Sequence, residues 1–141
     1  MQITQIDALT YVGPQISVAD MQELSLLGVR RIVVARPEGE ERGQPAISEI
    51  CTAAAAFDIR VHQIPVVPGQ ITDDDVRAFG EIIRGTSDPI FAYCRSGMRA
   101  TSLWALNAAA QGQAVDRILY DARIAKFDLT GLTARLTENA A

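Results

Sequence analysis

The sequence is poor in the residues that mark several classes of protein. Its 141 residues include one lysine, Lys126, and one histidine, His62, and the formal net charge is −4. A general nucleic-acid-binding protein needs clustered basic side chains that release counterions from phosphates, and the sequence has no such cluster. The composition therefore argues against nucleic acid as a partner.

Long apolar runs are also missing. The longest, such as residues 32–35 and 51–57, are far shorter than the roughly 20 residues that a membrane-spanning helix needs. The first residues have neither the basic start nor the apolar core of a signal peptide. We therefore expect a cytoplasmic protein with no membrane partner.

Cysteine is scarce too. Cys51 and Cys94 lie 43 positions apart, and without a secretion signal we expect both to be free thiols. Two cysteines and a single histidine do not make a zinc-binding pattern. We expect no metal and no other cofactor.

What the chain does contain is an alternation of two patterns. Hydrophobic residues make up 48% of it, which predicts one globular domain over residues 1–141. Short β-branched runs alternate with amphipathic stretches, which predicts a small, parallel-rich open α/β sheet with helices on both faces. The expected strands are 9–13, 29–35, 60–66 and 89–93, and the clearest expected helices are 46–57, 73–84 and 99–111. Ligands of such sheets bind beyond the carboxyl ends of the strands.

The residues that follow the last of these strands carry the strongest chemical signal. Residues 94–99 lead from strand to helix and read Cys94, Arg95, Ser96, Gly97, Met98 and Arg99. A strand that turns directly into a helix leaves backbone N–H groups free to bind an anion. We expect a positive φ at Gly97, a thiolate at Cys94 and the guanidinium of Arg99 folded back over this anion-binding loop. Cys51, among alanines in an expected helix, is interpreted as structural.

Two reactions use such a loop, and its length favours one of them. Cysteine phosphatases typically place five residues between cysteine and arginine, whereas four separate Cys94 from Arg99. The narrower loop resembles that of single-domain rhodaneses, which carry one sulfur atom as a cysteine persulfide. Phosphatases also need an aspartic acid that protonates the leaving group, and helix capping already explains residues 73–75. Two alternatives stay open: a phosphatase with a phosphocysteine, and a non-catalytic module that binds an anion or senses redox state.

Three segments extend the pattern over most of the chain: "YVGPQISVADMQELSLLGVRRIVVARPEGEE", "IPVVPGQIT" and "AYCRSGMRATSLWAL". Together they resemble the phosphatase-like domain of the beta-lactamase-hydrolase-like family, whose members are often described as sulfurtransferases. The resemblance implies a fold like that of dual-specificity phosphatases, with Cys94 as nucleophile and Arg99 as the loop arginine. Family members occur alone or fused to a metallo-β-lactamase-fold domain that resembles persulfide dioxygenases. The resemblance therefore implies sulfide detoxification, with such a dioxygenase as a partner.

Two further residues lie at the same expected sheet edge. Arg36 and Glu38 follow the end of an expected strand and are candidates for contact with a substrate such as thiosulfate or glutathione persulfide. The simpler interpretation is a solvated loop. From the residues and the resemblance together we expect a thiol sulfurtransferase.

Overall fold

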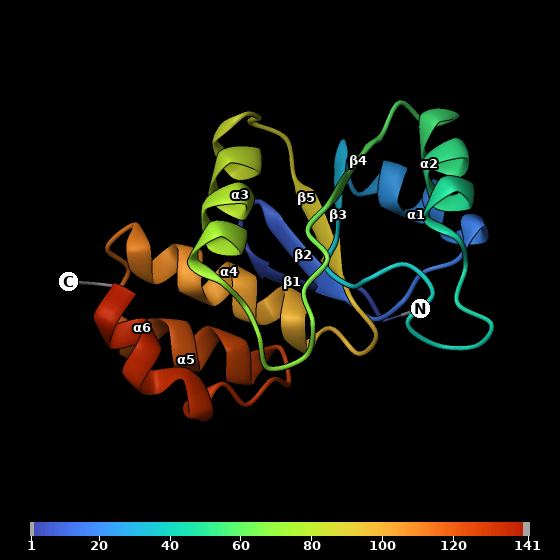
Figure 1. Ribbon diagram of the computed structural model, residues 1–141. Coiled ribbons are helices and arrows are strands. Elements are labelled where there is room, and N and C mark those ends of the chain that lie inside the picture. Colours follow the sequence, from blue (N-terminus) through green and yellow to red (C-terminus); the bar gives the residue numbers. More distant parts are fainter. Residues whose placement is uncertain (1, 140–141) are drawn as a thin grey trace.

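The protein is built around one five-stranded sheet with the strand order β1-β2-β5-β3-β4, seen in the computed structural model of Figure 1, which describes residues 2–139. The strands are β1 (Thr4–Asp7), β2 (Thr10–Gly13), β3 (Arg31–Val34), β4 (Arg60–Gln63) and β5 (Ile90–Tyr93). Strands β2, β5, β3 and β4 are parallel, and β1 is antiparallel to β2. The predicted parallel-rich α/β sheet is confirmed, although sequence reasoning missed β1.

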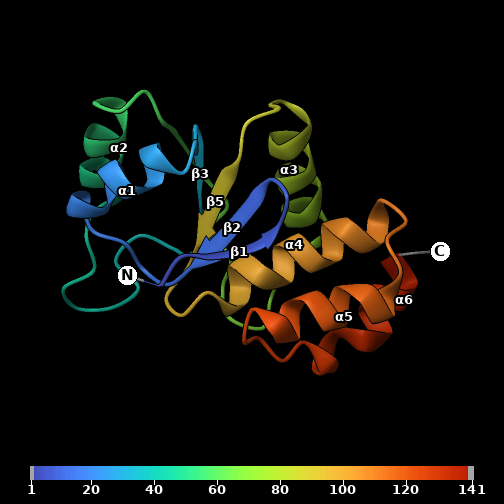
Figure 2. The ribbon, with the colours of Figure 1, turned by 180° about the vertical axis from the view of Figure 1, so that it is seen from behind.

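Helices cover both faces of the sheet, as Figures 1 and 2 show from opposite sides. One face carries α1 and α2, and the other carries α3 to α6. Their bounds are α1 (Met21–Leu26), α2 (Ile47–Ala55), α3 (Asp73–Arg84), α4 (Met98–Ala110), α5 (Val115–Ile124) and α6 (Thr133–Asn139), with short 3₁₀ turns at η1 (Val18–Asp20) and η2 (Thr130–Leu132). None of these helices is long and apolar enough to cross a membrane.

Strand β5 illustrates why the chain folds this way. All four of its residues are buried. Ile90 and Ala92 join the core beneath α3 to α6, whereas Phe91 and Tyr93 join the core beneath α1 and α2. Side chains of a strand alternate between faces, so a continuous apolar run is stable only where both faces are covered.

Helix α3 begins where the sequence predicts it. The Thr72 hydroxyl accepts a hydrogen bond from the Asp75 N–H (3.0 Å), and the Asp75 carboxylate accepts one from the Thr72 N–H (2.9 Å). This reciprocal pair satisfies two backbone donors that the first turn leaves free. The helix ends at Gly85, also as predicted.

The connections that follow the parallel strands converge at one edge of the sheet. The Gln15 N–H, after β2, donates to the Arg95 carbonyl, after β5 (3.3 Å). The Gln15 side chain in turn accepts a hydrogen bond from Arg36, which follows β3 (2.9 Å). This edge is where parallel sheets bind their ligands.

Candidate functional site

Cys94 lies at the turn between β5 and α4, and its sulfur already has a backbone donor. The Gly97 N–H donates to the Cys94 Sγ (3.1 Å), and Cys94 is only 1% exposed. The positive amino end of α4 faces the same turn, because the helix begins at Met98. Both features stabilise a negative charge on this sulfur.

Gly97 is required by the backbone and by its neighbour. Its φ is +100°, the left-handed region that was predicted, and side chains are rarely tolerated there. A Cβ at this position would lie 2.8 Å from the ring of Phe127. The turn is therefore fixed both by its own geometry and by the segment that follows α5.

Arg99 is held by a carboxylate from a distant part of the chain. Its two terminal nitrogens donate to the two oxygens of Glu40 (2.7 and 2.8 Å), and one of them also donates to the Val66 carbonyl (2.7 Å). The hydrogen bonds that Arg99 donates to Glu40 raise the pKa of Arg99 above its ordinary value, and the neighbouring Cys94 adds to the shift. Arg99 therefore stays charged near Cys94, and the two terminal nitrogens of its guanidinium point toward the Glu40 carboxylate.

Glu40 is shared between two arginines. Arg36 Nε donates to the same carboxylate (2.9 Å), and the Arg36 side chain is fully buried. The pKa of Glu40 lies below its ordinary value, mainly because of the hydrogen bond from Arg99 and despite the opposing effect of burial. Glu40 is thus an ionised brace at neutral pH and a poor proton donor.

The prediction that Arg36 contacts a substrate does not fit its complete burial, whereas the same prediction for the exposed Glu38 stays a prediction. Arg36 is inaccessible, because its guanidinium is occupied by Glu40 and Gln15 beneath the surface. The Glu38 carboxylate accepts hydrogen bonds from the Ile47 N–H (3.0 and 3.2 Å) and so caps α2. Both side chains stabilise the loop between β3 and α2, and Glu40 in that loop reaches the site.

The remaining residues of the predicted loop lie at its surface. Arg95 is 68% exposed and pairs with Glu41 (3.1 Å) at the rim. Ser96 and Met98 are exposed as well. Exposed pairs of this kind contribute about 0–1 kcal/mol, so Arg95 adds local charge more than stability.

The acidic start of α3 is occupied by structural contacts. Asp75 closes the cap with Thr72, Asp73 pairs with Arg135 (3.2 Å) and Asp74 pairs with Arg77. Within residues 2–139, no hydrogen bond joins Cys94 to a carboxylate. The same described residues contain no group of three or more His, Cys, Asp or Glu side chains that would hold a metal ion.

A pocket of about 340 Å³ adjoins the site on the side of α6. It is lined by Arg99 and Met98 from the start of α4, by Ile71 from the connection before α3, and by Leu132 and Arg135 near the C-terminus. Arg99 lines this pocket, and the neighbouring Cys94 contributes to the raised pKa of Arg99. The pocket therefore begins at the loop that carries Cys94.

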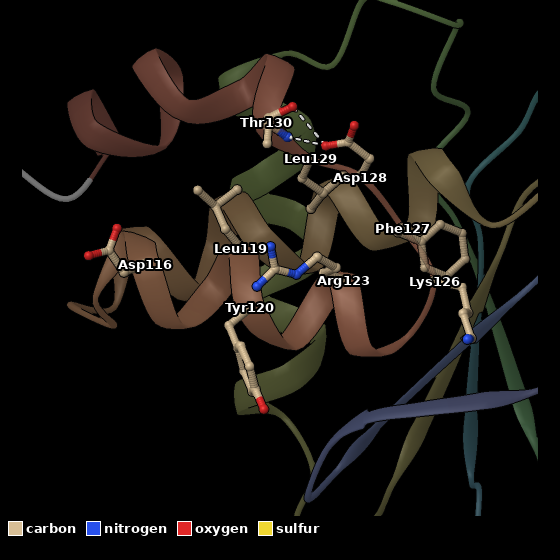
Figure 3. Close-up of a pocket in the computed structure, with 9 residues that line it drawn as sticks. All are labelled: Asp116, Leu119, Tyr120, Arg123, Lys126, Phe127, Asp128, Leu129 and Thr130. Atoms are coloured by element: carbon tan, nitrogen blue, oxygen red, sulfur yellow. Dashed lines mark hydrogen bonds between the residues drawn. The ribbon is translucent and has the colours of Figure 1, made fainter.

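A second hollow of about 530 Å³ lies along α5 and the segment after it, drawn in Figure 3. Lys126 and Phe127 lie at its end nearest the strands, and Tyr120 extends away from the helix. Neither Cys94 nor another residue of the 94–99 loop lines it. We therefore assign it no part in the chemistry at Cys94.

Comparison with solved structures supports a phosphatase-like fold. A "putative phosphatase" from Neisseria meningitidis is 33% identical, with a TM-score of 0.88 over 99% of both chains. A "putative phosphatase" from Shewanella putrefaciens is 14% identical, with a TM-score of 0.77 over 99% of this chain and 91% of the other. The second likeness shows the fold alone.

Curated sequences give the same family. The beta-lactamase hydrolase-like protein of Agrobacterium fabrum is 34% identical over all of this chain and 33% of its own length. Its counterpart in Xylella fastidiosa is 30% identical over 80% of this chain and 26% of its own length. This chain thus spans about a third or less of these curated relatives. The family model "Beta-lactamase hydrolase-like protein, phosphatase-like domain" matches residues 3–111, and the chain belongs to that family.

Proposed function

We propose that the protein is a thiol sulfurtransferase that carries sulfane sulfur as a persulfide on Cys94. The observation that carries this proposal is the narrow loop: four residues separate Cys94 from Arg99, and the sulfur is buried against the Gly97 N–H. We expect so short a loop to suit one added sulfur atom better than a tetrahedral phosphate. One sulfur on Cys94 would stay within reach of the backbone donors and the Arg99 guanidinium.

The reaction balances without an external oxidant. The Cys94 thiolate attacks the outer sulfur of thiosulfate, an S–S bond forms, the old S–S bond breaks, and sulfite leaves with the electron pair. An acceptor thiolate then attacks the outer sulfur of the Cys94 persulfide. It departs as a persulfide and regenerates the Cys94 thiolate. No proton donor is needed in either step, because both leaving groups are stable anions.

The carboxylates near the site fit this chemistry. Glu40 is ionised between Arg99 and Arg36, and Asp75 is bound in the cap of α3. A phosphatase needs a carboxylic acid that protonates a leaving alkoxide. The groups seen here have other partners, which favours a leaving group that needs no proton.

Hydrolysis of phosphate esters through a Cys94 phosphocysteine is the second candidate. The family model is described as phosphatase-like, and the Neisseria relative is described as a "putative phosphatase". These descriptions favour the phosphatase candidate, and none of them mentions sulfur transfer. The loop length favours sulfur transfer. The two candidates predict opposite results in the same pair of assays.

Paired assays on the same preparation separate the candidates. With thiosulfate and a small thiol acceptor we expect steady release of sulfite. With p-nitrophenyl phosphate we expect hydrolysis no faster than the Cys94→Ser control, and no inhibition of sulfur transfer by vanadate. Efficient, vanadate-sensitive phosphate release without sulfite would promote the phosphatase. Failure of both reactions would leave an anion-binding or redox-sensing module.

The persulfide product of this reaction suggests a partner enzyme. A low-molecular-weight persulfide such as glutathione persulfide is reactive and has to be consumed, which a persulfide-oxidising enzyme of metallo-β-lactamase fold would do. The curated relatives are about three times as long as this chain, so their remaining sequence has room for such a domain. We expect sulfite and acceptor persulfide to form in equal amounts. Adding a persulfide dioxygenase and O2 should then remove the persulfide, regenerate the acceptor thiol and release one further sulfite for each persulfide consumed.

A further inference from the structure

The pocket beside Arg99 is built from three separate parts of the chain. Met98 and Ser102 come from α4, Gly69 and Ile71 from the connection between β4 and α3, and Leu129 to Arg135 from the segment after α5. A volume of about 340 Å³ lies within the range of small-molecule sites, roughly 300–1,000 Å³. A ligand bound here would lie against the loop that holds the nucleophile.

The charged groups of this pocket already have partners. Arg99 is bound to Glu40, and Arg135 donates to the Ile71 carbonyl and to Asp73. The Asp128 carboxylate accepts hydrogen bonds from Thr130, which hold the pKa of Asp128 below its ordinary value. The lining that remains for a ligand is apolar.

From these contacts we infer that the pocket beside Arg99 holds the apolar body of an organic sulfur compound whose sulfur is exchanged at Cys94. The inference rests on the proposed function for the identity of the reacting atom. It adds a substrate class: a small thiol or sulfane donor with a hydrocarbon body, preferred over a purely inorganic donor. The apolar side chains that would contact this body are Ile71, Met98, Leu129 and Leu132.

The far wall of the pocket lies outside the range matched by the family model. That match ends at residue 111, whereas Leu129, Gly131, Leu132 and Arg135 follow it. The segment after α5 therefore shapes the pocket beside a loop that belongs to the matched part. This division assigns the reaction to residues 94–99 and the choice of substrate to residues 128–135.

Gly131 offers a way to fill the pocket without damaging the fold. It lines the pocket, its φ lies outside the left-handed region, and a Cβ added there would meet no atom within 4 Å. Gly131→Trp adds an indole at the exposed lining of the pocket, and Gly131→Ala is the matched control because it adds one methyl group.

Two donors with the same reacting group test the inference. Benzenethiosulfonate and methanethiosulfonate each lose their outer sulfur to the Cys94 thiolate and leave as a sulfinate with the electron pair. We expect kcat/KM for the benzene donor to exceed that for the methane donor by about tenfold or more, as burial of the larger apolar body requires. Gly131→Trp should abolish this preference, because the benzene donor loses far more of its rate than the methane donor does, whereas Gly131→Ala should keep the preference.

Each failure has a distinct meaning. Equal rates with the two donors, or an equal loss for both in Gly131→Trp, would overturn the inference while sulfur transfer itself stood. If neither donor loads Cys94 while thiosulfate does, the inference is overturned and the proposed function stands. If thiosulfate fails as well, the proposed function fails, and binding of benzenesulfonate then decides about the pocket. We expect that probe to shift the Met98 methyl resonance in the parent and in Gly131→Ala, but not in Gly131→Trp. An unshifted Met98 resonance in the parent would overturn the inference by itself.

Discussion

The two cysteines carry the same thiol group but lie in different surroundings. Cys51 lies within α2, half-buried, and packs against the core that contains Tyr93. Cys94 lies at the amino end of α4, more deeply buried, with the Gly97 N–H on its sulfur and Arg99 beside it. Exposure would select Cys51 as the reactive residue, whereas backbone donors and charge select Cys94. The proposed reactivity of Cys94 therefore rests on the turn that presents its sulfur and not on exposure.

The largest effect should come from exchanging the sulfur atoms. Cys94→Ser should reduce sulfur transfer by about a thousandfold or more, because a hydroxyl is not ionised at neutral pH and forms no persulfide. Cys51→Ser should leave the rate within about twofold, since a core position in a helix takes no part in the reaction. Sulfite release from thiosulfate is the measurement. Loss of transfer in Cys51→Ser with retention in Cys94→Ser would reverse the comparison.

An intermediate effect on the rate should come from Glu40, whose carboxylate holds Arg99 near Cys94. Glu40→Gln should lower kcat by about 10–100-fold with a smaller change in KM, because a charge-assisted bond to Arg99 is lost and the guanidinium is no longer held toward the sulfur. Glu41→Gln is the matched control, because Glu41 pairs with the exposed Arg95 and should change kcat by less than about threefold. Equal effects of the two variants would show that Glu40 acts through general charge.

The same brace has a defined pH dependence. Because the folded pKa of Glu40 lies below its ordinary value of 4.5, the stabilisation it contributes is complete above pH 4.5 and is lost as the pH falls through the folded pKa. The free energy of unfolding of the parent should therefore drop faster below pH 4.5 than that of Glu40→Gln. Denaturant titrations at several acidic pH values measure this, and parallel curves would contradict it.

The smallest effect should come from the acidic start of α3. Asp75→Ala should lower the free energy of unfolding by about 0.3–1 kcal/mol through the lost cap and helix-dipole contacts, and turnover should stay within a few-fold. Urea denaturation and the sulfite assay measure the two quantities. Loss of activity that is greatest at low pH, where a carboxylic acid is protonated, and that disappears at high pH would identify Asp75 as a proton donor and strengthen the phosphatase candidate.

Local features of this site were predictable from the sequence, and contacts over long sequence distances were not. The Thr72 cap, the positive φ of Gly97 and the placement of Cys94 after a buried strand depend on neighbouring residues, and each is present. Glu40 and Arg99 lie 59 positions apart, and no periodicity in the sequence pairs them. The short β1 was missed because its four residues carry little apolar pattern.

The burial of the charged Arg36 side chain was also not predicted from the sequence. Arg36 looked like a surface residue of a polar loop, because arginines are seldom fully buried without partners. In the fold its partners Glu40 and Gln15 come from separate loops at the sheet edge, so the burial is a property of the assembled edge. An arginine that follows a buried strand and precedes several glutamates, as in residues 36–41, is a pattern that would have suggested an internal ion pair.

Intact-mass spectrometry of the protein after brief treatment with thiosulfate, followed by removal of the excess, tests the central claim most directly. The account predicts a gain of one sulfur atom in the parent and in Cys51→Ser, its location on Cys94 after proteolysis, and its loss when an acceptor thiol is added. An unchanged mass in the parent, with a phosphate adduct on Cys94 after treatment with an aryl phosphate, would contradict it.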